Sequence, residues 1–285
     1  MLIYFYKYGW FYCFLILRAQ YNVDARGDIF LRILLVNDDG IAASGIKTLC
    51  EVLSEVKGYE VLVAAPATEQ SGMAQAITVH RPIRVENYDL RLPNHEIQAW
   101  KIHGTPADCV KLSLEVLLTE APPDLVISGI NRGSNLGTDV LYSGTVGAAI
   151  EAFLHGIPSI AVSLDVHSKF SFLWAAEQVK MKLTQWCEEA DGPFLYNVNF
   201  PKFINMEKDP FVFTKLGRRD YENAFHRIVD EEKHVSYQMA GEIVDKENDE
   251  ATDIFAANQG YISITPLQID LTDYLAIEGK LSAKD

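Results

Sequence analysis

Short apolar runs alternate with longer amphipathic stretches along the first two-thirds of the chain. An unbroken apolar run bounded by turn residues is typical of a buried strand, whereas apolar residues spaced three and four apart are typical of a helix face. Buried strands are predicted at 33–36, 61–65, 125–130, 159–164 and 194–199. Helices are predicted at about 44–53, 106–117, 145–155 and 172–189. This alternation predicts an α/β fold with a doubly wound, mostly parallel sheet.

Several residues beside these segments suit helix ends. Ser44 is expected to be an N-cap, Pro106 lies near a first helical position, and Gly156 stands where a C-cap glycine is favoured. The second helix is expected to pack through Leu112, Val116 and Leu117. Two less regular stretches, 77–85 and 97–103, are expected to be extended.

After about Pro201 the alternation stops. Strands without long helices between them are expected at 211–216, 234–238 and 260–264. We therefore expect a core at about 31–200 and a smaller β-rich arm with a C-terminal segment at about 201–285, the arm being used in oligomer contact. The acidic stretch 245–253 is expected to be an exposed loop.

Residues 1–30 differ from the rest of the chain. The stretch 1–17 is aromatic and aliphatic, a little short for a membrane-spanning helix, and has no clear Ala-x-Ala cleavage site. It is interpreted as a membrane anchor or signal, as an extension packed on the body, or as upstream translation that is not part of the native protein. The last is favoured because Leu31 begins a strand-like run.

Composition and charge narrow the class of protein. With 48% hydrophobic and 22% charged residues in 285, the chain is globular and long enough for one large domain. A net charge of −14 argues against a protein that coats DNA or RNA, since phosphate neutralisation needs positive charge. A small phosphorylated ligand remains compatible, because a bound metal supplies local positive charge.

The cysteines predict neither a zinc site nor a disulfide scaffold. They are far apart and form no Cys-x-x-Cys pair, which favours reduced thiols. The four are Cys13, Cys50, Cys109 and Cys187. Cys50 and Cys109 lie in apolar helical patterns and are predicted to be core residues.

Two adjacent carboxylates follow the first predicted strand. Asp38 and Asp39 lie directly before Gly40, at the carboxyl end of 33–36, where open α/β sheets bind ligands. Neighbouring carboxylates repel each other, and a divalent cation relieves the repulsion. The alternative is that both are ordinary turn residues.

Ser71 and Asn131 follow two further predicted strands. Together with Asp38 and Asp39 they offer carboxylate, hydroxyl and amide oxygens, which suit Mg²⁺ or Mn²⁺. No His-Glu-x-x-His motif or cysteine cluster competes for zinc.

Glycine-bearing loops at 131–137 and 143–145 have phosphate-binding potential. Glycine lets backbone N–H groups approach an anion, and the helix starting near Thr145 offers free N–H groups and its positive dipole end. The hydroxyls of Ser143 and Thr145 can donate as well. The alternative is that Gly133, Gly137 and Gly144 only shape turns. The chain has neither a Gly-x-x-x-x-Gly-Lys-[Ser/Thr] nor a Gly-x-Gly-x-x-Gly motif, so a P-loop or classical dinucleotide site is not supported.

Other titratable and aromatic residues are given ordinary structural roles. A general-acid role is not assigned to His80, His95, His103 or His155, because a lone histidine is more often a surface or satisfied residue. Tyr221 and Phe225 can stack on a base, but packing is the expected role.

An ordered set of motifs, covering about 31–272, resembles the SurE survival-protein family of metal-dependent 5′/3′-nucleotidases. The motifs are Asn37-Asp38-Asp39-Gly40, Ser71-Gly72, Gly104-Thr105-Pro106 with Asp108-Cys109, Ser128-Gly129-Ile130-Asn131, Asn135-Leu136-Gly137, Tyr142-Ser143-Gly144-Thr145 and the run from Gly260 to Leu267. The resemblance implies a Rossmann-like core with a smaller β-rich part that exchanges between subunits, in a cytoplasmic homodimer or homotetramer.

The resemblance also implies roles for single residues. The metal ligands would be Asp38, Asp39, Ser71 and Asn131, holding one Mn²⁺ or Mg²⁺ per subunit. The phosphate contacts would be Asn135, Ser143, Gly144 and Thr145. The substrate would be a small nucleotide, with no nucleic-acid duplex or membrane as partner.

Four positions depart from the family pattern. Leu31 stands where the family chain usually starts with Met, Gln70 replaces an Arg common before Ser-Gly, and Arg132 replaces a small residue beside Asn131. Glu250 begins the stretch where a glycine commonly precedes Thr-Asp. Gln70 and Arg132 bear on substrate preference, and Glu250 bears on the loop before the last strand.

The expected reaction is hydrolysis of a phosphomonoester by a metal-activated water, with Asp38 and Asp39 holding the metal and one of them orienting or deprotonating the water. A covalent aspartyl-phosphate on Asp38 is less favoured, because the pair lacks Asp-x-Asp spacing. One alternative is a nucleotide-binding or oligomeric scaffold without turnover. Another is a membrane-anchored phosphatase that uses residues 1–20.

Overall fold

One mixed sheet forms the body of the computed structural model, which describes residues 22–23, 29–190, 192–205, 209–245 and 248–277. Its strands are β1 (Asn22–Val23), β2 (Ile29–Val36), β3 (Tyr59–Pro66), β4 (Val85–Asn87), β5 (Gln98–Ile102), β6 (Leu125–Arg132), β7 (Ser159–Leu164), β8 (Leu195–Phe200), β9 (Phe211–Phe213) and β14 (Ile262–Pro266). In the described residues their order is β4-β5-β3-β2-β6-β7-β8-β14-β9, and β1 pairs with β2 beside this path. The neighbours from β5 to β8 are all parallel. The doubly wound, mostly parallel sheet is thus confirmed.

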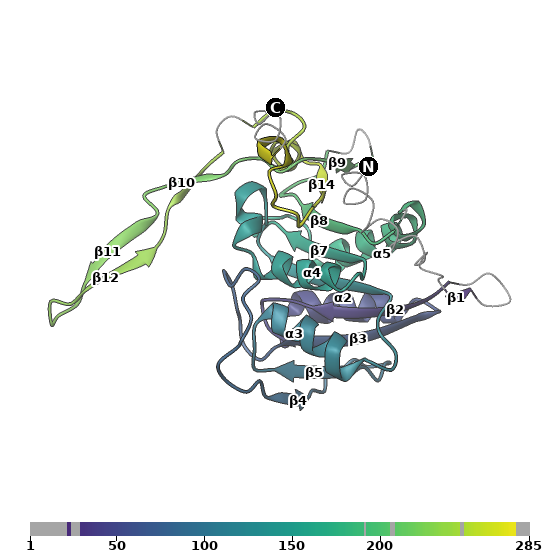
Figure 1. The fold of residues 1–285 in the computed structure, drawn as a ribbon. Helices are drawn as coiled ribbons and strands as arrows, with labels where there is room; N and C mark the ends of the chain where they lie inside the picture. The colour runs from purple at the N-terminus through teal and green to yellow at the C-terminus, as the bar shows by residue number, and fades with distance from the viewer. Residues whose placement is uncertain (1–21, 24–28, 191, 206–208, 246–247, 278–285) are drawn as a thin grey trace, which may run out of the picture.

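Helices cover both faces of this sheet (Figure 1). The long helices are α2 (Ser44–Ser54), α3 (Pro106–Leu112), α4 (Gly144–Leu154) and α5 (Phe172–Glu189). A π-helix, η1 (Ser113–Leu117), continues α3, and a 3₁₀-helix, η2 (Gly137–Leu141), precedes α4. Helices α2 and α5 share one core cluster with the sheet, and α3 and α4 pack on the opposite face. No described helix is long and apolar enough to cross a membrane.

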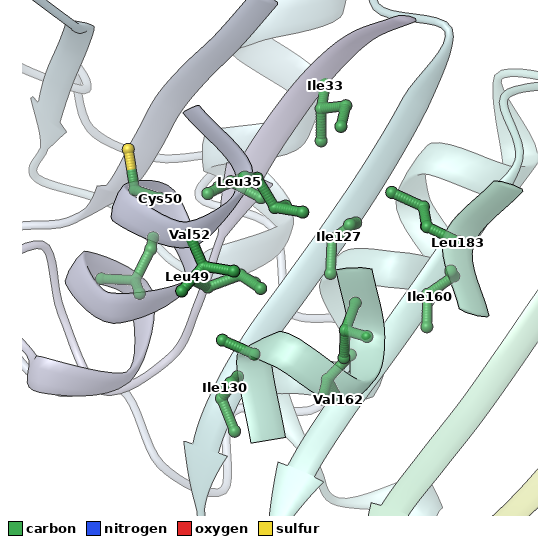
Figure 2. Close-up of a cluster of buried hydrophobic side chains, with 14 of the residues drawn as sticks. Ile33, Leu35, Leu49, Cys50, Val52, Ile127, Ile130, Ile160, Val162 and Leu183 are labelled. Atoms are coloured by element: carbon green, nitrogen blue, oxygen red, sulfur yellow. The ribbon is translucent and has the colours of Figure 1, made fainter. Parts of the chain in front are cut away.

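Strand β2 shows why the first apolar run lies at the centre. Ile33 and Leu35 belong to the cluster under α2 and α5, whereas Leu34 and Val36 belong to the cluster under α3. All four side chains are fully buried, and each such burial contributes about 1.5–3 kcal/mol. Figure 2 shows Leu35 beside Leu49, from α2, in the first of these clusters. A strand buried on both faces needs an unbroken apolar run, and that is what the sequence has there.

The C-terminal strands are divided between the sheet and an arm. β14 pairs antiparallel with β8 and parallel with β9, so both extend the main sheet. The arm is a hairpin of β11 (Phe225–Val229) and β12 (Val235–Met239), and β10 (Asp220–Glu222) pairs with β13 (Glu242–Val244) at its base. Every residue of the two hairpin strands is exposed, and Figure 1 shows the hairpin projecting away from the body. Phe225, in β11, is 59% exposed. The prediction that it packs is therefore wrong for the single chain.

Helix ends were predicted with mixed success. Pro106 and Gly156 stand where expected, with Thr105 as N-cap before Pro106 and His155 as C-cap before Gly156. Ser44 is not an N-cap, because Ala43 occupies that position without a side-chain cap and Ser44 is already helical. Cys50 and Cys109 are both fully buried, as predicted.

Three further expectations differ from the structure. Val116 is 61% exposed, because the π-helical turn η1 changes the helical spacing after Leu112. In the stretch 77–85 only Val85 belongs to a strand. Asp253, at the end of the predicted exposed loop 245–253, is buried. It starts a short helix, α6 (Asp253–Asn258), that was not predicted from the sequence. The interpretations of residues 1–21 and 24–28 lie outside the described residues.

Candidate active site

The predicted metal ligands come from the ends of three adjacent strands. The turn after β2 holds Asp38 and Asp39, the loop after β3 holds Ser71, and Asn131 lies near the end of β6. β3, β2 and β6 are parallel neighbours, so their carboxyl ends share one edge of the sheet. Between β2 and β6 the chain order along the sheet reverses, and such a switch point is where open α/β sheets bind ligands.

Backbone hydrogen bonds join these strand ends to one another. The Gln70 N–H donates to the backbone oxygen of Asp38 at 2.7 Å, and the Arg132 N–H donates to Asp39 Oδ2 at 3.2 Å. Asn131 was predicted in a loop, but it pairs with Ser163 of β7 after an irregularity in β6 and so belongs to the strand. The backbone of Asp38 is therefore held by the loop after β3, and the Asp39 carboxylate is held by the end of β6.

Asp38 is buried and fixed by the first turn of α4. Its carboxylate is only 4% exposed and accepts hydrogen bonds from the Thr145 hydroxyl and the Thr145 backbone N–H. The pKa of Asp38 is raised to about 6, chiefly by burial; the charge of Asp39 contributes to this rise, whereas the bonds from Thr145 oppose it. This is a carboxylate whose negative charge is costly until a positive group joins it.

Asp39 is half-buried and more accessible. Burial raises its pKa, the nearby Glu69 charge adds to the rise, and the Arg132 N–H and guanidinium oppose it. Thus two carboxylates of unequal exposure stand side by side: Asp38 is buried and bonded to Thr145, and Asp39 is half-buried.

Asn131 and Ser71 supply neutral oxygens at the same edge. Asn131 donates its amide nitrogen to the Gly133 backbone oxygen at 2.8 Å, which fixes the side-chain orientation and leaves Oδ1 as an acceptor. Ser71 is exposed, and its hydroxyl donates to Glu69 Oε1 at 2.8 Å. Within the described chain, Ser71 is thus oriented by a carboxylate that was not predicted as part of the site.

The loop that carries Ser71 packs tightly against α4. The Ala74 N–H donates to the Tyr142 backbone oxygen at 3.0 Å. A Cβ on Gly147 would lie 2.1 Å from the Ala74 backbone oxygen, so only glycine permits this approach. The absence of a side chain in α4 therefore brings the Ser71 loop to the helix whose first turn holds Asp38.

Ser143 and Gly144 form the N-terminal end of α4 beside the carboxylates. Ser143 is the N-cap and accepts the Val146 N–H at 3.1 Å, which leaves its hydroxyl proton for another acceptor. A Cβ on Gly144 would lie 2.9 Å from Asp38 Cβ and 3.1 Å from Gln70 O. The N-terminal end of α4, with its positive dipole end, thus lies directly against Asp38.

Thr145 has a different partner from the predicted one. Its side chain is fully buried and its hydroxyl donates to Asp38, so that hydroxyl is not directed toward a phosphate. The sequence could not show this, because the two residues are 107 positions apart.

Asn135 is held by a set of buried polar side chains that sequence reasoning missed. Its backbone N–H donates to Asn199 Oδ1 at 2.8 Å, and its backbone oxygen accepts from Asn197 at 2.8 Å and Asn199 at 3.1 Å. Its side chain donates to Ser163 at 2.8 Å. The available signal was a pair of asparagines two residues apart inside a predicted strand, which places both on one face.

The histidines with hydrogen bonds lie in other clusters. His103 pairs with Glu86 at 2.6 Å and His155 with Glu115 at 3.1 Å. The Tyr221 hydroxyl donates to Asp139 at 2.8 Å. The three partners, Glu86, Glu115 and Asp139, are not among the predicted site residues.

Known proteins are similar to this chain over most of its length. The family model described as Survival protein SurE matches residues 33–223. The chain belongs to the SurE family. It is 46% identical over 249 residues to 5′-nucleotidase SurE of Synechococcus sp. (strain JA-3-3Ab), which covers 87% of this chain and 95% of that protein.

A second relative and a solved structure give the same family. The 5′-nucleotidase SurE of Heliobacterium modesticaldum (strain ATCC 51547 / Ice1) is 46% identical over 249 residues, 87% of this chain and 90% of that protein. The crystal structure of the SurE protein from Aquifex aeolicus superposes with a TM-score of 0.73 at 35% identity, covering 89% of this chain and all of that one. The family resemblance and the fold inferred from the motifs are confirmed.

The donor set at this SurE site fits a hard divalent cation. Asp38 and Asp39 place two negative charges side by side, and Asp38 is buried. Among the described residues, no cationic side chain forms a hydrogen bond or ion pair with either carboxylate. The described residues contain no group of three or more His, Cys, Asp and Glu that could hold a metal. A site here therefore depends on the oxygens of Ser71 and Asn131, which favours Mg²⁺ or Mn²⁺ over zinc.

Proposed function

We propose that the chain hydrolyses nucleoside 5′-monophosphates, and 3′-monophosphates as well, to nucleoside and inorganic phosphate. The curated relatives, which carry the name 5′-nucleotidase SurE, support the reaction class. The observation that carries the proposal is the contact between Gly144 and Asp38, which brings a helix N-terminus for phosphate beside two adjacent carboxylates. A protein that only binds nucleotides needs the helix N-terminus, but it does not need the two adjacent carboxylates.

Each group in the site has a distinct part in the proposed reaction. The Ser143 hydroxyl and the Gly144 N–H at the start of α4 hold the phosphate oxygens and stabilise charge as it moves to the leaving alcohol. Asn135 is a further phosphate contact through its side chain. Asp39, the more exposed carboxylate, orients a water molecule or takes its proton, while Asp38 stays fixed by Thr145.

Asp38, Asp39, Ser71 and Asn131 would hold one Mn²⁺ or Mg²⁺ per subunit. When bound, the cation supplies positive charge beside the phosphate and lowers the pKa of a water molecule. Burial of Asp38 and, to a lesser degree, its repulsion from Asp39 raise the pKa of Asp38, and a bound cation would offset both, which supports this assignment.

We also propose a cytoplasmic homodimer or homotetramer that forms through the arm. The exposed apolar side chains of the hairpin support a protein contact there, since isolated two-stranded hairpins are marginally stable in water. They include Phe225, Ile228, Val229, Val235, Tyr237 and Met239. The nucleotide is the only partner proposed for the site itself.

Phosphate release from a panel of nucleoside 5′- and 3′-monophosphates tests the reaction. We expect release by the full chain with Mn²⁺ or Mg²⁺, a fall on the order of 10²-fold or more with excess EDTA, and recovery when either metal is restored. Release that is unaffected by EDTA would refute the metal assignment. Metal-loaded, folded protein that binds nucleotides without turnover would favour the binding-protein alternative.

Thr145→Val is expected to weaken the reaction through Asp38. The variant keeps the size of the side chain but removes the hydroxyl donor, and loss of such a supporting group typically costs about 10–100-fold in activity. Steady-state kinetics should show this fall for Thr145→Val and a fall of less than about 3-fold for Thr145→Ser, which keeps the donor. Equal activity of the valine and serine variants would show that the hydroxyl does not matter.

A further inference from the structure

Three consecutive residues at the start of η2 are tied to the segment that leads into the arm. We call residues 217–221 the arm root. Asp253 joins the two segments, accepting the Gly137 N–H at Oδ2 and the Gly217 N–H at Oδ1, both at 2.8 Å. Next, the Thr138 hydroxyl donates to the Arg219 backbone oxygen at 2.7 Å and accepts the Arg219 N–H at 3.3 Å.

The third tie is a buried ion-pair network centred on Arg219. Its side chain is only 8% exposed and donates to Asp139 Oδ2 at 3.1 Å and to both carboxylate oxygens of Asp245, at 3.0 and 3.2 Å. The Tyr221 hydroxyl donates to the same Asp139 oxygen at 2.8 Å. Burial acts to lower the pKa of Arg219, but the two carboxylates outweigh it and raise that pKa above its ordinary value. The guanidinium therefore keeps its charge in this partly dry site.

Asp139 passes this constraint to the loop that precedes α4. While its side chain binds Arg219, its backbone oxygen accepts the N–H groups of Tyr142, at 3.0 Å, and Ser143, at 3.1 Å. Ser143 caps α4, and the following Gly144 lies against Asp38. A continuous path of hydrogen bonds thus runs from Arg219 to the N-terminal end of the helix beside the carboxylates.

We propose that Arg219 is a positioning residue for phosphate, which fixes the loop 142–145 through Asp139. The proposal rests on the proposed function, because it assigns phosphate to that loop. Arg219 does not touch the substrate; it sets where the Ser143 hydroxyl and the Gly144 N–H lie. Since Arg219 also carries the arm root, the phosphate loop and the base of the arm form one constrained unit.

Arg219→Met and Arg218→Met make a matched pair for the test. Arg218 is the neighbouring arginine, but its side chain is 75% exposed and, among the residues that the structure describes, pairs with Asp220. Arg219→Met is expected to raise the inhibition constant of inorganic phosphate and to lower kcat/KM by about 10–100-fold each, as loss of a supporting group does. Arg218→Met should change both by less than about 2-fold, as surface substitutions usually do.

A double-variant cycle and a milder change separate positioning from general stability. Asp139→Asn should weaken phosphate inhibition as well, and combining it with Arg219→Met should add little, since both break the same path. If Arg219→Met does not fold, Tyr221→Phe and Arg219→Lys still perturb Asp139 and are expected to raise the phosphate inhibition constant by about 2–10-fold.

The readouts distinguish this proposal from the proposed function. If the wild-type chain hydrolyses no nucleotide, calorimetric binding of inorganic phosphate to the folded, metal-loaded chain and its variants still tests Arg219. A lowered melting temperature with unchanged phosphate affinity in Arg219→Met or Arg219→Lys would overturn the proposal and leave Arg219 with a purely structural role.

Discussion

Asp39→Asn is expected to lower kcat/KM for nucleoside monophosphates by about 10³-fold or more, as loss of a metal-holding or proton-accepting group does. Asp39 is the half-buried and more accessible carboxylate of the pair. The asparagine keeps an oxygen that can accept the Arg132 N–H, so the local hydrogen bond at 3.2 Å can persist. What disappears is one of the two adjacent negative charges, carried by the more exposed carboxylate of the pair.

Stability should move differently from activity in this variant. Removing one of two adjacent carboxylates relieves their repulsion, so the melting temperature measured in EDTA should stay level or rise. Asp89→Asn is the control, because the Asp89 side chain is 82% exposed and lies outside the site. Retention of a tenth or more of wild-type kcat/KM in Asp39→Asn, at saturating metal, would exclude a central role for this carboxylate.

Gly144→Ala is expected to reduce kcat/KM by about 10²-fold or more, because the new methyl group displaces Asp38 or α4. Its Cβ would lie 2.9 Å from Asp38 Cβ, 3.1 Å from Asp38 Oδ2 and 3.1 Å from Gln70 O. Alanine favours a helix over glycine, so propensity alone predicts a gain in stability. An observed loss of about 1–3 kcal/mol in the free energy of unfolding therefore reports the collision.

Gly156→Ala at the other end of α4 is the matched control. Gly156 has a φ of +77°, and a Cβ there would meet nothing within 4 Å. The variant should lose about 1 kcal/mol of stability from the left-handed backbone, yet keep kcat/KM within about 2-fold. A comparable loss of activity in both variants would mean that the effect comes from α4 as a whole. If Gly144→Ala loses no activity, the close approach of Gly144 to Asp38 does not matter for the reaction.

The parallel core was predictable because its strands are local signals. A strand covered by helices on both faces is apolar at most positions, so 33–36, 125–130 and 159–164 are recognisable one by one. The chain can leave such a strand only at a turn, and the turn residues Asp38, Asp39 and Gly40 mark that point. Because parallel strands end at a common edge, these local signals were also enough to bring the acidic turn, the Ser71 loop and Asn131 to one edge.

The sequence by itself therefore determined the sheet type, the family and which strand ends meet at the edge that carries the candidate site. Only the tertiary structure decided how those residues are supported: the Thr145 hydroxyl belongs to Asp38, Asn199 holds Asn135, and Asp253 is buried. The physical reason is distance along the chain. Strand formation and turn chemistry depend on a few neighbouring residues, whereas burial and the choice of a hydrogen-bond partner depend on segments that meet only after folding, 107 positions apart for Thr145 and Asp38 and 80 for Arg219 and Asp139.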